Sequence, residues 1–444
     1  MNIQELYEIF KQHPEITTDS RTCPVGSIFF ALKGETFDGN AYAKASLEKG
    51  CAYAVVDEKE YADEQDERII LVDDALQTLQ DLARFHREKL GTTIVGVTGS
   101  NGKTTTKELI AAVLQKKYKI HYTQGNFNNH IGVPKTLLQL TPEHEMAVVE
   151  MGANHPGEIK TLVNIVRPDF GIITSVGVAH IEGFGSFEGV VRTKGELYDF
   201  IREHGGQVFI NSDNPHLMGI SHGLQLVRYG RLKKEENAEQ DPRFTTPHAS
   251  PNLVDGELVS SNPFLCFKWN GHEVQTHLIG DYNIDNALAA ATIGTYFDVP
   301  AEAICEALEE YVPSNNRSQY EQTAFNRLVI DAYNANPTSM HAALHNFCQM
   351  TLPHKMCILG AMRELGNLGQ EEHQKLVDFL KDAGFEQVWL VGEEFESTQH
   401  PASFRLFKDV EEVKFAIAQY KPQNMTILIK GSNSNKLFEL PKVL

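Results

Sequence analysis

The residues best suited to chemistry form one short stretch, 98–106, which reads Thr-Gly-Ser-Asn-Gly-Lys-Thr-Thr-Thr. An apolar run at 93–97 precedes it, and apolar residues at helical spacing follow it. Strand, glycine turn and helix form the setting of a phosphate-binding loop, in which backbone N–H groups and the helix N-terminus face an anion. Lys103 is then expected to reach the terminal phosphates of a nucleotide, and the Thr104 hydroxyl to bind Mg²⁺. The residues expected at the nucleotide phosphates are Gly99, Ser100, Asn101, Gly102, Lys103, Thr104 and Thr105.

One departure marks this loop, because Val97 stands where the general phosphate-loop pattern has a glycine. The stretch is therefore a tighter variant of the motif. A plain strand-to-helix turn with an exposed lysine is the alternative interpretation. The strand before it, the helix after it and the Lys-Thr pair favour phosphate binding.

Two further candidates follow buried strands of the same segment. The apolar run 146–150 ends in Glu150, and His180 lies just past a strand expected at 171–177. Ligand sites in open α/β sheets gather at the carboxyl ends of strands, and nucleotide-binding sheets place a Mg²⁺-binding carboxylate there. We therefore expect Glu150 and His180 at the edge of the sheet that carries the phosphate loop.

Lys194 lies on the apolar face of the helix expected after His180, four residues after Val190 and three before Leu197. An inward ammonium is unfavourable unless it is paired or uncharged. The simpler alternative is that the side chain extends along the helix and exposes its charge at the edge. We favour a Lys194 that is neutral and chemically modified, or paired with phosphate or carboxylate, because anionic groups are expected nearby.

Polar loops offer candidates for substrate binding. The stretches 19–21 and 33–39 combine hydroxyls, glycines and an arginine, which could bind a sugar nucleotide or form ordinary turns. The stretch 124–134 carries three asparagines among glycines, which could orient a polar substrate or again form a turn. The residues alone leave both alternatives open.

The elements that must position these residues predict an α/β protein of three domains, since 444 residues exceed what one core supports. Short strands and helices alternate in a small N-terminal α/β domain at 1–84. A central domain at 85–312, similar to P-loop ATPases, holds the phosphate loop and a polar excursion at 232–262 that we expect to be an exposed loop. A C-terminal Rossmann-like domain at 313–444 alternates strand and helix without the dinucleotide motif G-x-G-x-x-G.

Bulk charge and composition exclude several classes of function. The formal charge of -19, from 40 basic and 59 acidic residues, argues against nucleic acid and anionic membrane surfaces as partners. The N-terminus lacks an apolar signal core, and no apolar run is long enough to span a bilayer. The six cysteines form no C-x-x-C pair and are typical of a reducing compartment. We expect a cytoplasmic protein.

Several longer motifs resemble one known family. They are DSR at 19–21, TGSNGKTTTK at 98–107, GNFNNHIGVP at 125–134, EMGANHPGEI at 150–159, SVGVAHIEGFGS at 175–186, TKGEL at 193–197, NIDNALAA at 283–290, DAYNANPTSM at 331–340, LGAMRELG at 359–366 and KGS at 430–432. Over essentially its whole length the chain resembles the Mur ligases, ATP-dependent amide-forming enzymes of peptidoglycan synthesis. GNFNNHIGVP and DAYNANP resemble the branch that joins D-alanyl-D-alanine to UDP-N-acetylmuramoyl-tripeptide. The chain departs from the family pattern at two positions: Tyr282 stands where histidine is common, and Asn316 stands where glycine is common. The resemblance implies that both positions lie near the nucleotide.

The resemblance implies a division of labour among the domains. The N-terminal domain would bind the UDP-sugar, and the central domain would bind ATP and Mg²⁺. In the family the lysine at the place of Lys194 is carbamylated and helps to hold a second Mg²⁺. The metal ligands implied here are Thr104, Glu150, His180 and Lys194. The nucleotide contacts implied beyond the loop are Asn286, Arg317 and Asp331. The substrate contacts implied are Ser20, Arg21, Gly34, Glu35, Asp38, Asn128, Asn129, Asn334 and Asn336.

The implied reaction forms an acyl phosphate on the peptide carboxylate, which the amine of D-alanyl-D-alanine then attacks, and Lys103, Lys194, His180 and Glu150 are the expected catalytic residues. A monomer is expected, and the third peptide residue could be diaminopimelate or lysine. Two alternatives stay open. One is a related ligase with another acceptor, such as a neighbouring Mur enzyme or a glutamate-adding folate ligase. The other is a binding protein switched by nucleotide hydrolysis.

Overall fold

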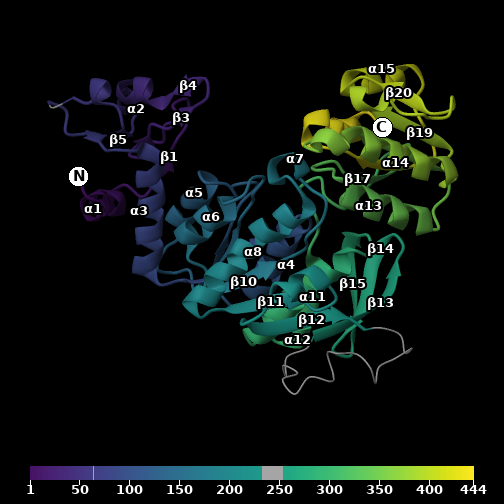
Figure 1. Ribbon diagram of the computed structural model, residues 1–444, viewed down its shortest axis with the longest axis horizontal. Helices are drawn as coiled ribbons and strands as arrows, with labels where there is room; N and C mark the ends of the chain where they lie inside the picture. Colours follow the sequence, from purple (N-terminus) through teal and green to yellow (C-terminus); the bar gives the residue numbers. More distant parts are fainter. Residues whose placement is uncertain (64, 233–253) are drawn as a thin grey trace. The chain divides into compact units, whose positions relative to one another are not determined.

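The computed structural model describes residues 1–63, 65–232 and 254–444 (Figure 1). The described residues form a mixed α/β structure, which confirms the predicted fold class. A four-stranded, a nine-stranded and a six-stranded sheet follow one another along the sequence. Contacts group the chain into a first unit (Met1–Gly96, Tyr118–Gly152 and Glu158–Phe170) and a second unit (Val97–Lys117, Ala153–Gly157 and Gly171–Leu444). No helix among the described residues combines the length and apolar character needed to cross a membrane.

The four-stranded sheet lies in the first unit and is parallel, with strand order β1-β2-β5-β6. Its strands read as short continuous apolar runs because both faces are covered. The helix α3 begins after Asp74, whose side chain accepts from the Gln77 N–H, and ends at Gly91 in the left-handed conformation. The elements are α1 (Ile3–Gln12), β1 (Ile16–Thr17), β2 (Ile28–Phe30), the hairpin β3 (Lys33–Gly34) and β4 (Phe37–Asp38), α2 (Ala43–Glu48), β5 (Tyr53–Val56), β6 (Ile69–Leu71) and α3 (Ala75–Leu90).

The nine-stranded sheet has strand order β15-β14-β13-β12-β11-β10-β7-β9-β8. The pairs β8/β9, β11/β12 and β12/β13 are parallel, and β13 to β15 form an antiparallel edge. Its strands are β7 (Thr93–Thr98), β8 (Ile120–Tyr122), β9 (Met146–Glu150), β10 (Phe170–Ile173), β11 (Gln207–Asn211), β12 (Gln225–Arg231), β13 (Val254–Ser261), β14 (Phe264–Trp269) and β15 (His272–Ile279). The helices of this part of the sequence are α4 (Lys103–Gln115), α5 (Gly132–Leu138), α6 (Glu158–Val166), α7 (Ile181–Phe184), α8 (Phe187–His204), α9 (Pro215–Gly219), α11 (Asn283–Tyr296) and α12 (Ala301–Glu310).

The six-stranded sheet lies in the second unit, with strand order β16-β17-β21-β18-β19-β20. All its pairs are parallel except the edge pair β16/β17. Its elements are β16 (Gln319–Gln322), β17 (Arg327–Asp331), α13 (Pro337–Gln349), β18 (Lys355–Gly360), α14 (Gly369–Asp382), β19 (Gln387–Val391), β20 (Arg405–Phe407), α15 (Val410–Gln419) and β21 (Thr426–Lys430).

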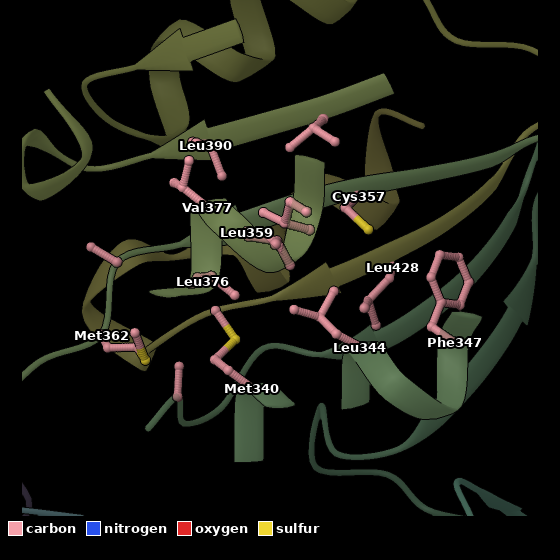
Figure 2. Close-up of a cluster of buried hydrophobic side chains, with 14 of the residues drawn as sticks. Met340, Leu344, Phe347, Cys357, Leu359, Met362, Leu376, Val377, Leu390 and Leu428 are labelled. Carbon is pink, nitrogen blue, oxygen red and sulfur yellow. The ribbon is translucent and has the colours of Figure 1, made fainter. Parts of the chain in front are cut away.

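Both faces of the six-stranded sheet are buried, because successive side chains of β18 pack into two different hydrophobic clusters. Cys357 and Leu359 pack into one cluster with residues of α13 and α14, which Figure 2 shows. Ile358 packs into a second cluster, on the side of α15. Successive side chains of a strand point to opposite faces, so an apolar run without alternation requires cover on both sides. This is the doubly wound arrangement that the sequence predicts, and it directs the carboxyl ends of the parallel strands to one edge.

Two predicted elements differ from the structure. The strand expected at 171–177 ends earlier, as β10 stops at Ile173 and residues 174–177 form an irregular segment that bonds to the phosphate loop. The exposed loop expected at 232–262 is wrong at its end, because Val254–Ser261 form β13. Pairing with β12 and β14 stabilises this polar strand, which composition alone had suggested to be irregular. Residues 233–253 of that prediction lie outside the described residues.

Candidate active site

The predicted phosphate loop lies between β7 and α4, as the sequence indicates, and two of its glycines are required by its shape. Gly99 has φ +148°, and a Cβ there would lie 2.1 Å from Thr174 Oγ1. Gly102 has φ +82°, and a Cβ there would lie 2.6 Å from Asn286 Oδ1. Only glycine combines these backbone angles with such close approach. Helix α4 begins at Lys103, so its N-terminal turn is directed at the loop.

The side chains around the loop hold it in this shape. The Lys103 ammonium donates to the carbonyl oxygens of Gly99 (2.8 Å) and Ser100 (3.3 Å). The N–H of Asn101 donates to Ser175 Oγ at 3.0 Å. The irregular segment after β10 therefore forms one wall of the loop.

The predicted nucleotide contact Asn286 lies on α11 and faces the phosphate-loop helix. Its Oδ1 accepts from Thr106 Oγ1 at 3.0 Å, and its Nδ2 donates to Asn283 Oδ1 at 2.7 Å. The neighbouring residues Thr104 and Thr105 are also buried. The structure thus brings Asn286 next to the loop helix, with its amide already engaged by protein groups.

Lys194 lies on the buried face of α8, where the sequence places it. Its side chain is 1% exposed, and its ammonium donates to the Ala153 carbonyl at 3.0 Å. The same ammonium lies 5.2 Å from the centre of the Phe184 ring. A carbonyl oxygen and an aromatic face both favour a cation, which explains how the ammonium form can occupy this position.

His180 lies next to the same ring, with its ring edge-on to Phe184 at 6.3 Å between centroids. Burial lowers the pKa of His180, and the hydrogen bond that its ring donates to the Glu364 carboxylate opposes that shift. The positive charges of Lys103 and Lys194 lower this pKa further. The structure therefore brings His180, Lys103 and Lys194 into one electrostatic neighbourhood.

The carboxyl edge of the six-stranded sheet carries the next predicted residues. Asp331 ends β17, and its carboxylate accepts from the Lys430 ammonium at 2.5 Å. Lys430 ends β21 directly opposite, is 1% exposed, and also donates to the Asn334 carbonyl at 3.3 Å. The Arg317 guanidinium lies 3.9 Å from the centre of the Tyr333 ring.

Two segments of this edge contact the phosphate loop and its wall. Asn336 begins α13 as its N-cap, and its Nδ2 donates to Asn101 Oδ1 at 2.8 Å. The Thr338 hydroxyl accepts from the Val178 N–H at 3.1 Å. Asn334, by contrast, has an exposed side chain. The loop and the C-terminal edge thus share side-chain hydrogen bonds within the second unit.

Sequence reasoning assigned no role to three residues that this site contains: Glu364, Lys430 and Thr338. Glu364 and Lys430 lie in the motifs LGAMRELG and KGS. Glu364 follows one predicted strand and Lys430 follows another. The rule that ligand sites gather at the carboxyl ends of parallel strands could therefore have identified these two residues.

In the first unit Glu150 ends β9 and is 1% exposed. Its carboxylate accepts from Asn128 Nδ2 at 2.8 Å, and its N–H donates to Thr123 Oγ1 at 2.9 Å. Asn129 has a structural role, because its Oδ1 accepts from the N–H groups of Ile131 and Gly132 where α5 begins. Asn128 is therefore hydrogen-bonded to Glu150, a candidate metal ligand, and Asn129 stabilises the turn before α5.

The predicted sugar-nucleotide residues lie in loops of the four-stranded sheet. Arg21 is bound to Asp19 by two hydrogen bonds, which lower the pKa of the Asp19 carboxyl to about 2. Ser20 is buried, and its carbonyl accepts from the Lys49 ammonium at 2.6 Å. Gly34 and Asp38 lie in the β3–β4 hairpin and Glu35 in its exposed turn.

The donor chemistry fits a magnesium ion that is also held by phosphates. Among the described residues, no group of three or more His, Cys, Asp or Glu side chains gathers as a metal site. Mg²⁺ is commonly bound by one or two carboxylates together with substrate phosphates and water, not by a complete protein cage. The Thr104 hydroxyl in the second unit and, separately, the buried Glu150 carboxylate in the first unit each have the oxygen chemistry that Mg²⁺ prefers.

Comparison with known proteins gives consistent matches over the chain. Three family models match: "Mur ligase family, catalytic domain" at residues 14–87, "Mur ligase middle domain" at 97–294 and "Mur ligase, glutamate ligase domain" at 316–433. A UDP-N-acetylmuramoyl-tripeptide–D-alanyl-D-alanine ligase of Bacillus subtilis is 33% identical, covering 97% of this chain and 92% of the relative. The Escherichia coli protein of the same name is also 33% identical, covering 97% and 93%.

Solved structures agree with this result. A crystal structure of MurF from Acinetobacter baumannii matches with a TM-score of 0.83 and 28% identity, covering 99% of this chain and 98% of the other. MurF from Thermotoga maritima, solved in complex with ADP, has the same fold at a TM-score of 0.82 and 24% identity, with 97% of each chain covered.

Proposed function

The chain belongs to the Mur ligase family, and from this we propose that it is an ATP-dependent, ADP-forming ligase that joins D-alanyl-D-alanine to UDP-N-acetylmuramoyl-tripeptide. The observation that carries the proposal is the phosphate loop, whose Asn101 is hydrogen-bonded to Asn336 of the DAYNANP motif. One motif is common to nucleotide enzymes and the other resembles this branch of the family. A ligase of this kind must bring its nucleotide and its acceptor together.

We assign ATP to the loop between β7 and α4. The glycines leave room for phosphate oxygens, and Lys103 exchanges its contacts with Gly99 and Ser100 for the terminal phosphates. The proposed phosphate-binding residues are Gly99, Ser100, Asn101, Gly102, Lys103, Thr104 and Thr105. Asn286, Arg317 and Asp331 are the proposed contacts to the rest of the nucleotide.

Magnesium ions would be held by Thr104, Glu150, His180 and Lys194, the last as a carbamate. The bound metal offsets the negative charge that develops when a phosphoryl group meets a carboxylate. The burial of Lys194 supports the modification, because desolvation opposes the ammonium that the Ala153 carbonyl and the Phe184 ring otherwise stabilise, and the neutral amine is the form that reacts with CO₂. The carbamate would be an oxygen ligand, which suits Mg²⁺ better than an amine does.

The proposed chemistry has two steps. An oxygen of the tripeptide carboxylate attacks the terminal phosphorus of ATP, the bond to ADP breaks, and an acyl phosphate forms. The amine of D-alanyl-D-alanine then attacks the acyl carbon, loses a proton, and expels inorganic phosphate as the amide forms. Lys103 stabilises the charge on the phosphoryl oxygens in the first step. Protein groups around the reacting atoms exclude water, which would hydrolyse the acyl phosphate.

The substrates would be bound by separate groups of residues. The UDP-sugar is assigned to Ser20, Arg21, Gly34, Glu35 and Asp38. The peptide and the D-dipeptide are assigned to Asn128, Asn129, Asn334 and Asn336. For Asn129 and Asn336 the side chains already cap turns of helix, so these two would act by holding the backbone around the substrate. We propose that these groups belong to domains at 1–84, 85–312 and 313–444 of a monomer.

Phosphate release tests the proposal directly. The purified protein with ATP and Mg²⁺ should release phosphate only when both a UDP-N-acetylmuramoyl-tripeptide and D-alanyl-D-alanine are present. Parallel reactions with the diaminopimelate and lysine forms identify the preferred tripeptide. Release that needs glutamate and a folate, or that needs neither substrate and responds to a protein partner, would contradict the proposed function.

A further inference from the structure

His180 and Glu364 form a side-chain pair between residues 184 positions apart in the sequence. The pair joins His180 Nδ1 to Glu364 Oε2. A carboxylate only accepts hydrogen bonds, so Nδ1 must carry the proton and donate it. In a neutral ring this leaves Nε2 as the nitrogen with the lone pair.

Resting on the function proposed above, we propose that Glu364 is a positioning residue that fixes His180 in its Nδ1–H form, so that the Nε2 lone pair is available to the metal ion bound with the nucleotide. Metal-binding histidines commonly donate their other N–H to a carboxylate, which sets both the tautomer and the ring orientation. Glu364 would perform this function from the loop after β18.

The backbone around the pair supports a maintained contact. The N–H of Glu182 donates to the Glu364 carbonyl at 3.2 Å, so the two segments are also joined through the main chain. His180 and Glu364 have φ values of +52° and +60°. Side-chain-bearing residues rarely adopt the left-handed region, and clusters of such residues are common at functional sites. Both partners therefore hold backbone conformations that their segments must enforce.

The surroundings explain why the tautomer needs fixing. The plane of the Phe184 ring is at 83° to the imidazole, and this ring offers no hydrogen bond to hold the imidazole. The Lys194 ammonium lies on that ring at 5.2 Å. Glu364 is therefore the carboxylate that the described structure pairs with His180 Nδ1. Without Glu364, both neutral tautomers of His180 are populated. In the Nε2–H tautomer the nitrogen that should bind the metal ion carries a proton instead of a lone pair.

A metal-free measurement tests the tautomer. Protein labelled with ¹⁵N-histidine is compared as wild type, Glu364→Ala and Glu182→Gln, and the His180 signals are assigned by their loss in His180→Gln. Glu182 is the matched control because it lies two residues from His180, is exposed, and carries the same charge. The Nδ1–H form should dominate in wild type and Glu182→Gln and should fall in Glu364→Ala. An unchanged tautomer in Glu364→Ala overturns the proposal.

Manganese affinity in the presence of a non-hydrolysable ATP analogue gives the second measurement. Loss of such a supporting carboxylate typically weakens metal binding 10- to 100-fold, which we expect for Glu364→Ala. Glu364→Gln should lose less, because its amide oxygen still accepts the Nδ1 proton. In a His180→Ala background Glu364→Ala should have no further effect, and an equal loss there would also overturn the proposal. If wild type neither binds Mn²⁺ with the analogue nor releases phosphate, the proposed function fails, while the tautomer measurement still decides the role of Glu364.

Discussion

Replacing Lys430 by Met should destabilise the six-stranded sheet. Met has a similar length but no charge, so the change removes the cation and keeps most of the packing. The Lys430 side chain is 1% exposed and that of Asp331 is 18% exposed. The two residues are direct neighbours on the parallel strands β17 and β21. The variant therefore leaves the Asp331 carboxylate without its partner in a mostly buried position.

The size of the effect follows from the geometry. Two unit charges about 4 Å apart attract by roughly 4 kcal/mol at an effective dielectric constant of about 20. Removing one partner of a fully buried pair typically costs about 3–5 kcal/mol, because a buried charge is left behind. Asp331 keeps some access to water, so we expect a loss of about 2–3 kcal/mol in the free energy of unfolding. Changing Asp331 to Asn in the same variant should recover part of this loss, since no charge then remains.

Urea unfolding with one tryptophan provides the assay. The chain has 2 tryptophans, and Trp389 lies in the same buried cluster as Ile330 and Ile429. In a Trp269→Phe background the fluorescence of Trp389 reports this sheet alone. At a typical slope of about 1–3 kcal/mol per molar urea, the midpoint should fall by about 1 M. Lys414→Met is the matched control, because Lys414 pairs with Glu411 and Glu439 near the surface. Equal midpoints for the two variants would refute the reasoning.

Three further predictions concern other parts of the chain. Gly99→Ala should weaken binding of an ATP analogue in calorimetry by roughly 10- to 100-fold, since its Cβ would meet Thr174 Oγ1. Gly384 also has a positive φ (+72°) but no atom within 4 Å of where a Cβ would lie, so Gly384→Ala is the control and should leave binding unchanged. Burial lowers the pKa of His86 below its ordinary 6.5, so the folded state binds this proton less readily and loses stability as the pH falls through 6.5. The protection factors of the α3 amides, which are the intrinsic exchange rates divided by the observed rates, should therefore fall over this range, and constant protection factors would be contrary evidence. Lys194→Ala should lose ligase activity, and added acetate should partly restore it. Lys194→Arg should stay inactive with acetate, because its fixed positive charge repels the metal ion. Full activity of Lys194→Ala without acetate would exclude the carbamate.

Local patterns in the sequence predicted the elements that carry one part of the site. Strand β9 coincides with the predicted run 146–150, and Lys194 lies on the buried face that helical spacing assigned to it. The phosphate loop follows from glycine, lysine and threonine between a strand and a helix. These features depend on residues close in sequence, for which hydrophobic period and turn chemistry suffice.

Contacts between distant residues could not be predicted in this way. Asn336 meets Asn101 across 235 positions, and His180 meets Glu364 across 184. Periodicity assigns a residue to a face or a strand end, but it does not say which other strand end lies opposite. For the same reason β13 was missed, since its polar residues are stabilised by pairing with β12 and β14 and not by local preference.

The acidic composition and the proposed anionic substrates are compatible because the relevant cations are buried. The formal charge is -19, yet Lys107, one turn after Lys103 on α4, is 0% exposed. Salt screens exposed charges over about 8 Å at physiological ionic strength, while buried charges are screened much less. The field of a few buried cations therefore dominates over short distances, although the surface as a whole is acidic. Net charge predicts the behaviour of the surface towards large polyanions, whereas the local potential at the phosphate loop is set by Lys103, Lys107 and the N-terminal turn of α4.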